Sequence, residues 1–390
     1  MTSSPERVGT TSMDRPVRSF LSHFSWSRIA NWLSAHDEAL HRLIREQIPQ
    51  SLVRSSLGLS LGRLVQRTVK SHARREQSTT TFFLRNRPEL ELVCSIFRCK
   101  PNWAPIDIAV LGCSNGAEVY SIAWALRNAR ADLDVHIHAV DINKEVVEFA
   151  KRGAYSLPST DIETRADHSS ESASAQVATK THRVGASSLF ERMIGSEFDE
   201  MFELSRTDAF VRRNLREGIT WLVSDANAPN LSEVIGLQDV VFANRFLCHM
   251  PPAEAERCLI NAMALVKPGG YLFVSGIDLE VRAQTAIKMG WRPVTTLIRE
   301  IHEGDPSVLV GWPFKYWGLE PFDNRIPKWE YRYAAVFQNS VTNAIRVHDL
   351  RKQDVGDFMP DYPLLPALNS QEALIASLRR RIKNDAVSSG

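Results

Sequence analysis

The sequence predicts an α/β fold in which a doubly wound, mostly parallel sheet is covered by helices on both faces, preceded by a helical module. Short apolar runs typical of buried strands alternate with helical patterns along the middle of the chain. The first run ends in a glycine turn at 112–116 that leads into a helix, and the next ends in an acid, Asp141. Such sheets hold ligands at the carboxyl ends of their strands, where both features fall.

Length and composition set the outer bounds of this prediction. The 390 residues, 44% hydrophobic and 24% charged, suit a globular protein with one substantial core. A net charge of +2 gives no reason to expect nucleic acid as a partner, and no apolar run is long enough for membrane insertion. The five cysteines form no C-x-x-C pair and no metal-ligand spacing with histidine. We therefore expect reduced thiols, no metal site and a cytoplasmic protein; the oligomeric state is not indicated.

The chain divides by composition into successive segments. Residues 1–18 are polar and expected to be disordered, and 19–78 show helical spacing that predicts a small helical module with a basic face. We expect that face to be solvated, as charged faces usually are. Residues 79–340 form the main domain, in which 156–188 is expected to be a mobile insertion. Residues 341–390 form a polar tail with an amphipathic terminal helix.

Within the main domain the elements are expected in alternating order. The helical spacing of the apolar residues predicts helix through 189–214 and again at 282–290. Apolar runs predict strands at 135–140, 219–223, 239–244, 291–301 and 329–337, and residues 265–274 are expected to hold a helix end, a Pro-Gly-Gly turn and a further strand.

The glycine turn indicates what kind of ligand this fold would hold. A dinucleotide site needs G-x-G-x-x-G, but only Gly112 and Gly116 are present, and Glu118 at the helix start would repel a pyrophosphate. S-adenosylmethionine has no phosphate, an ammonium that Glu118 can pair and ribose hydroxyls that Asp141 can bind. The alternative is that the glycines only form a turn and Asp141 caps a helix. Asp225 and further polar residues at the other strand ends favour the binding site.

Four motifs resemble those of the CheR-type methyltransferases, which use S-adenosylmethionine to esterify glutamate side chains of bacterial chemoreceptors. The family's C-S-x-G-E-E-P-Y-S is matched by Cys113-Ser114-Asn115-Gly116-Ala117-Glu118-Val119-Tyr120-Ser121, and its T-x-F-F-R, D-I-D/N and A-x-x-G-x-Y by residues 80–85, 141–143 and 150–155. The resemblance covers roughly residues 79–277 and implies a class I methyltransferase fold with S-adenosylmethionine as cofactor. The expected cofactor-binding residues are Gly112, Cys113, Ser114, Gly116, Glu118, Asp141, Ile142, Asp225, Ala226 and Asn244.

The acceptor side departs from the family pattern. Where the family has R-N-V-x-I-Y-F this chain has Asn244-Arg245 in inverted order and His249 at the tyrosine position. Leu84 stands in place of the family's upstream arginine, and Arg85 follows one residue late. We expect Asn244, Arg245 and His249 to face the methyl acceptor and Arg85 to help place its charge.

Three functions stay open. A carboxylate acceptor, on a protein or a small molecule, is already ionised at neutral pH and needs no general base. A hydroxyl or amine acceptor would usually need one, and His249 is the candidate base; the simpler interpretation of His249 is a polar strand-end residue. A third possibility is a catalytically silent sensor or scaffold that binds the cofactor.

Family members that bind a receptor tail insert a small β-subdomain. The sequence shows no hairpin signal in residues 189–214, so we expect no such sheet here.

Overall fold

The computed structural model describes residues 55–72, 81–157, 189–205, 207–228, 230–305, 312–313 and 317–340. The chain divides into two compact units, one made of residues 1–74 with 310–316 and the other of the remainder. The expected disordered start, most of the helical module, nearly all of the 156–188 insertion and the 341–390 tail lie outside the described residues.

The first unit is represented by one amphipathic helix, α5 (Ser56–His72). Leu59 is buried along it, and Gln66 accepts a hydrogen bond from the indole nitrogen of Trp312 at 3.4 Å. A helix in this part of the expected helical module is therefore present.

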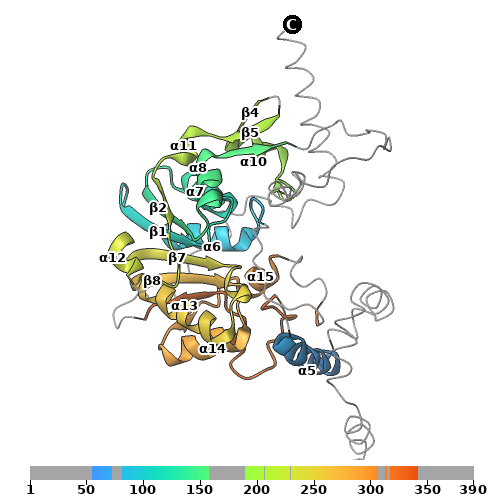
Figure 1. Ribbon diagram of the computed structural model, residues 1–390. Helices are drawn as coiled ribbons and strands as arrows, with labels where there is room; N and C mark the ends of the chain where they lie inside the picture. The colour runs from blue at the N-terminus through green and yellow to red at the C-terminus, as the bar shows by residue number, and fades with distance from the viewer. Residues whose placement is uncertain are drawn as a thin grey trace, which may run out of the picture. The chain divides into compact units, whose positions relative to one another are not determined.

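The second unit is built on a seven-stranded sheet with the order β6-β2-β1-β7-β8-β10-β9 (Figure 1). The first five strands in this order run parallel, and β10 runs antiparallel to both of its neighbours. The strand order reverses between β1 and β7, which is the switch point of a doubly wound sheet. The predicted α/β class is therefore confirmed. The strand bounds are β1 (Pro105–Leu111), β2 (Asp134–Asp141), β6 (Ile219–Val223), β7 (Gln238–Asn244), β8 (Val266–Ser275), β9 (Arg292–Pro293) and β10 (Val336–Gln338).

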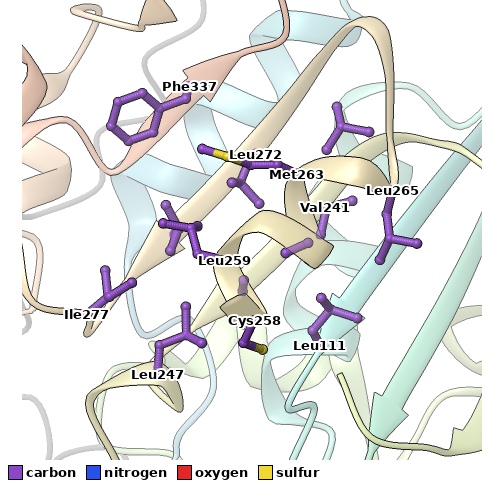
Figure 2. Packing of buried hydrophobic residues seen from close by; sticks show 14 of the residues in the cluster. Leu111, Val241, Leu247, Cys258, Leu259, Met263, Leu265, Leu272, Ile277 and Phe337 are labelled. Carbon is purple, nitrogen blue, oxygen red and sulfur yellow. The ribbon is translucent and has the colours of Figure 1, made fainter. Parts of the chain in front are cut away.

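Helices cover both faces of the sheet. Successive side chains of a strand point to opposite faces, so one strand contributes to the packing on each side. On β1, Ile108 and Val110 pack with one set of helices, and Ala109 and Leu111 pack with another. The first set includes α6 (Arg87–Phe97) and α7 (Ala117–Ala129). The second is α12 (Leu231–Ile235), α13 (Pro252–Ala264) and α14 (Leu279–Lys288). Figure 2 shows this second core, in which Leu259 and Met263 of α13 lie over the strands.

Local sequence fixes where several of these helices begin. Pro88 occupies the first turn of α6, where the missing N–H costs nothing. Asn143 caps α8 (Lys144–Arg152) and Asp278 caps α14, each accepting two backbone N–H groups that the helix leaves free.

A second, three-stranded antiparallel sheet corrects two expectations. It has the order β3-β5-β4, from β3 (Ala154–Ser156), β4 (Phe202–Leu204) and β5 (Asp208–Val211). Within the expected helix over 189–214 the structure has α10 (Gly195–Met201) and the start of the short α11 (Arg213–Arg216). The expectation of a continuous helix was therefore wrong, and so was the expectation that no small sheet is present. Tertiary packing explains the difference, since the small sheet encloses an aromatic core of Phe83, Tyr155, Phe190, Phe198 and Phe202.

The last part of the domain also differs from the expected strands. Only Arg292–Pro293 of residues 291–301 is strand, and α15 (Ile298–Glu303) follows. Residues 329–337 begin as the short helix α16 (Trp329–Tyr333) before β10. Ile301 of α15 and Tyr333 of α16 are both buried. The apolar residues of these segments are therefore explained by helices that pack into the core, and not by strands.

Within the described residues, no helix combines the length and the apolar character that crossing a membrane requires.

Candidate functional site

One cavity of about 330 Å³ opens at the carboxyl ends of β1, β2, β6 and β7, at the switch point of the sheet. Its size falls within the range of small-molecule sites. With the exception of Gly116, every residue expected to bind the cofactor or the acceptor lines it: Arg85, Gly112, Cys113, Ser114, Glu118, Asp141, Ile142, Asp225, Ala226, Asn244, Arg245 and His249. Glu118 and Asp141, on which the interpretation depends, thus share one cavity.

In the glycine turn after β1, the backbone angles and the neighbouring side chains leave little room for any residue other than glycine at two positions. Gly112 and Gly116 have φ of 68° and 85°, and a Cβ on Gly112 would lie 2.8 Å from the ring of Phe246. Gly116 is the N-cap of α7 and packs closely against Ala150. The first free N–H of α7, on Ala117, is already bound by the Asn115 side chain at 3.0 Å. That bond and the nearby Glu118 carboxylate leave the helix start unsuited to a phosphate.

Asp141 holds the turn in place from the end of β2. Its Oδ2 accepts the Ser114 N–H at 2.9 Å, and its Oδ1 accepts the Asn143 N–H at 3.0 Å. Each carboxylate oxygen still has a second lone pair for a hydroxyl donor. Asp141 therefore does not cap α8, whose N-cap is Asn143; it holds the turn and lies on the cavity wall.

A second acid, which sequence reasoning missed, lies beside Glu118. The amide nitrogen of Asn244 donates to Glu118 Oε1 at 2.7 Å and to Glu89 Oε2 at 3.0 Å, while Ser275 Oγ donates to Asn244 Oδ1 at 2.8 Å. Burial raises the pKa of Glu89 to about 8, with the charge of Glu118 adding to the effect, and burial also raises the pKa of Glu118. Asn244 thus orients both acids, and its own polar groups are engaged.

The cationic side of the cavity is organised by Asp305, which is fully buried. Three arginines converge on it: Arg85 at 2.7 Å, Arg192 at 2.7 Å and Arg245 at 3.5 Å. Arg85 reaches this position because Leu84 before it has a left-handed backbone, with φ of 53°, whose N–H is held by Ser121 Oγ of α7. One carboxylate therefore faces three positive charges next to the cavity.

Of the three arginines around Asp305, Arg245 has a buried N–H group available for a further hydrogen bond. Its Nη1 is buried and, within the described part of the chain, has no hydrogen-bond partner. Burial lowers its pKa to about 10, so the guanidinium is still charged at neutral pH. An anion in the cavity would supply the missing acceptor.

The remaining predicted residues lie around the cavity mouth. Ile142 lines the cavity with a side chain that is 58% exposed. Asp225 is exposed and holds the Asn227 N–H, and Ala226 beside it is buried. His249 lies in the short 3-10 helix Leu247–His249 (η1) that follows β7.

Cys113 lines the cavity but is not suited to nucleophilic chemistry, because burial raises the pKa of its thiol well above the ordinary value. None of the five cysteines forms a disulfide.

Several residues that line the cavity could not be identified from the sequence as residues of a binding site. Glu89 belongs to an amphipathic helix, on which a charged residue ordinarily faces solvent, and only the packing of α6 turns it inward. The other lining residues that were not predicted include Thr81, Asn86, Phe246, Met250, Glu254 and Ser275.

The side chains present fit S-adenosylmethionine. The cavity offers acids at the position for an ammonium, an acid with free lone pairs for a diol and an exposed apolar side chain for a flat base. Nothing at the start of α7 is arranged for a phosphate.

Comparison with known proteins gives a family for this domain. Residues 79–184 match the model of the "CheR methyltransferase, SAM binding domain" family. A curated Pseudomonas putida protein named "Putative methyltransferase Cher3" is 42% identical over 57 residues, which are 15% of this chain and 21% of that protein. The chain thus matches about a fifth of the length of its curated relative.

Solved structures give weaker likenesses. Magnesium protoporphyrin IX methyltransferase (ChlM) from Synechocystis aligns at 13% identity and a TM-score of 0.27, covering 64% of this chain and 86% of that one. The CcbJ methyltransferase from Streptomyces caelestis aligns at 14% identity and a TM-score of 0.26, covering 49% and 53%. TM-scores this low do not establish a shared fold, so the fold class depends on the strand order itself. Residues 79–184, within a doubly wound α/β fold of the class I methyltransferase type, are thus similar to the S-adenosylmethionine-binding domain of the CheR-type methyltransferases.

Proposed function

We propose that this chain transfers the methyl group of S-adenosylmethionine to a carboxylate oxygen of a protein or a small molecule. The observation that carries the choice of acceptor is a buried N–H of Arg245, on the cavity wall, that has no acceptor among the described residues. Arg85 lies beside it, and both arginines contact Asp305. Anionic groups fit this arrangement, and hydroxyls or amines gain little from it.

The cofactor, when bound, supplies an electrophilic methyl group on a sulfonium. The chain's own residues hold it in place: Glu118 binds the ammonium, Asp141 the ribose hydroxyls, and Asp225 with Ala226 the adenine edge. The exposed side chain of Ile142 covers one face of the base. Holding donor and acceptor together accounts for much of the acceleration such a transfer needs.

Arg245 and Arg85 orient the acceptor in this proposal. A carboxylate acceptor has a pKa of about 4.3, so it is ionised at neutral pH and needs no proton removed. Asn244, which was expected to face the acceptor, is engaged with two acids and a serine, so we assign it a positioning role.

The small sheet supports a protein as the acceptor. Among the described residues its edge strands are β3 and β4, and an edge strand can accept an extended peptide as an added strand. The resembled family uses an inserted β-subdomain of this kind to bind a receptor tail, which makes a tethered protein substrate part of the proposal.

The second candidate is transfer to a hydroxyl or amine, favoured by His249 on the cavity wall. The third is a silent module that binds the cofactor without turnover.

Methyl-labelled S-adenosylmethionine separates the three. The full chain is incubated with the labelled cofactor and two acceptor pools, one of glutamate-rich peptides and one of small carboxylic acids. We expect label that alkali releases as methanol, because esters hydrolyse in base. Label that survives alkali would favour the hydroxyl or amine acceptor, and cofactor binding without labelled product would favour the silent module.

Arg245→Gln tests the acceptor assignment directly. We expect it to lower the transfer rate about 10- to 100-fold, the range of a lost charge-assisted hydrogen bond. Arg213→Gln, on an arginine that is 93% exposed, is the matched control and should leave the rate unchanged. Equal rates in the two variants would contradict the role of Arg245.

A further inference from the structure

Glu89 is a buried acid that the proposed function does not yet use. It is 4% exposed, lies in the first turn of α6 and lines the cavity. Its Oε2 is held by Asn244, but Oε1 is buried and has no hydrogen-bond partner among the residues that the structure describes. A buried polar atom beside a cavity costs free energy until a ligand satisfies it.

Glu89 and Glu118 act as a pair because they share one donor group. Both accept from the same amide nitrogen of Asn244, at 3.0 and 2.7 Å. An amide nitrogen has two N–H groups, so Asn244 satisfies one oxygen of each acid and has none left. The pair is therefore oriented from one side and open to a second donor from the cavity side.

The charges around Glu89 do not neutralise both acids. Glu118 faces it from α7, Arg245 from the end of β7, Arg85 from the segment before α6 and Arg282 from α14. Arg85 and Arg245 are already paired with Asp305, and Arg282 donates to two backbone carbonyl groups. Two adjacent acids in such a site hold one proton between them, as paired carboxyl groups do elsewhere. The raised pKa of Glu89, about 8, places that proton on Glu89 at neutral pH.

We propose that Glu89 and Glu118 together bind the α-ammonium group of S-adenosylmethionine, and that Glu89 releases its proton to solvent when the ammonium enters. This inference rests on the proposed function for the identity of the ligand. The balance is simple: the ammonium keeps its three protons and donates to the two carboxylates, and the proton of Glu89 leaves to the buffer. No covalent bond other than that O–H bond breaks.

Calorimetry measures this proton directly. S-adenosylhomocysteine, which carries the same ammonium, is titrated into the full chain at pH 7 in buffers that differ in ionisation enthalpy. The dependence of the binding heat on that enthalpy gives the number of protons released. We expect about one proton for S-adenosylhomocysteine. 5′-Methylthioadenosine, which lacks the amino-acid part, should bind without releasing a proton.

Two variants assign the proton to a residue. Glu89→Gln keeps an acceptor for Asn244 but cannot ionise, so we expect it to abolish the release and to weaken S-adenosylhomocysteine about 10-fold, as loss of one charged partner does. Glu91→Gln is the matched control, because burial also raises the pKa of Glu91 on the same helix, yet that residue is not among those lining the cavity. It should release the proton as the unmodified chain does.

Each result bears on the inference. Proton release that survives Glu89→Gln, or that Glu91→Gln removes, would overturn it. S-adenosylhomocysteine binding to the unmodified chain without release would overturn it while leaving the proposed function intact, and no binding at all would overturn both. Infrared difference spectra of the unmodified chain give an answer independent of the variants: the band of a protonated carboxyl group should disappear when S-adenosylhomocysteine binds, and its persistence would overturn the inference.

Discussion

Replacing Glu89 by glutamine should change how the stability of the free chain depends on pH. In the folded chain burial raises the pKa of this carboxyl from 4.5 to about 8, so Glu89 keeps its proton to a pH at which the unfolded chain has lost it. Unfolding then releases a proton, and the free energy of unfolding falls as the pH rises between the two values. The stability that protonated Glu89 provides relative to the ionised form is fully present below pH 4.5 and is lost by pH 8.

The size of this effect follows from the two pKa values. At about 1.4 kcal/mol per unit, the rise from 4.5 to about 8 amounts to an upper value of ~5 kcal/mol. Glutamine does not ionise, so the variant should gain stability relative to the unmodified chain by up to this amount as the pH rises from 5 to 8.

Urea denaturation at several pH values, followed by tryptophan fluorescence, measures the difference. Glu148→Gln, on an exposed glutamate of α8, is the control and should follow the unmodified chain. If the unfolding free energies of the unmodified chain and of Glu89→Gln ran parallel across this pH range, Glu89 would be ionised in the folded chain and the reasoning would be refuted.

Three further changes have defined outcomes. Gly112→Ala should lower the free energy of unfolding by ~1–3 kcal/mol, because it combines a φ of 68° with a Cβ 2.8 Å from Phe246. Gly290→Ala, with φ of 69° and no atom within 4 Å, is the control for the positive φ; an equal loss in both variants by thermal unfolding would mean that the Phe246 contact costs nothing. Asp305→Asn should cost ~3–5 kcal/mol in urea denaturation, since it leaves three arginines without their shared carboxylate, and a change under 1 kcal/mol would contradict this. His249→Gln should leave steady-state transfer to a carboxylate within a few-fold, whereas a 10²- to 10⁴-fold loss would identify His249 as a general base.

The central sheet could be predicted because its inner strands, such as β1 and β7, are buried on both faces and therefore read as apolar runs. The runs before Asp141 and at Ile219–Val223 match β2 and β6 closely. The small sheet could not, because β4 continues directly from α10. Phe198, Met201 and Phe202 keep helical spacing across that junction, and only their packing against Phe83 decides where the helix ends.

The candidate site divides in the same way. Its acids and arginines at strand ends, such as Glu118, Asp141 and Arg245, could be located because the topology brings strand ends together. Glu89 and Asp305 could not, because each is a charged residue in a segment whose inward orientation depends on a partner far along the chain. Whether a charged side chain is buried is a property of the assembled fold, not of its neighbours in sequence.

Tyr155 of β3 donates a hydrogen bond, at 2.6 Å, to the backbone carbonyl of Asn115 in the glycine turn. The small sheet and the turn are therefore joined by a direct bond as well as by the chain. For protein engineering this means that the small sheet is not an exchangeable cassette. A chimera that replaces it with the corresponding sheet of another protein has to keep a tyrosine at this position, or the turn loses one of the contacts that hold its shape.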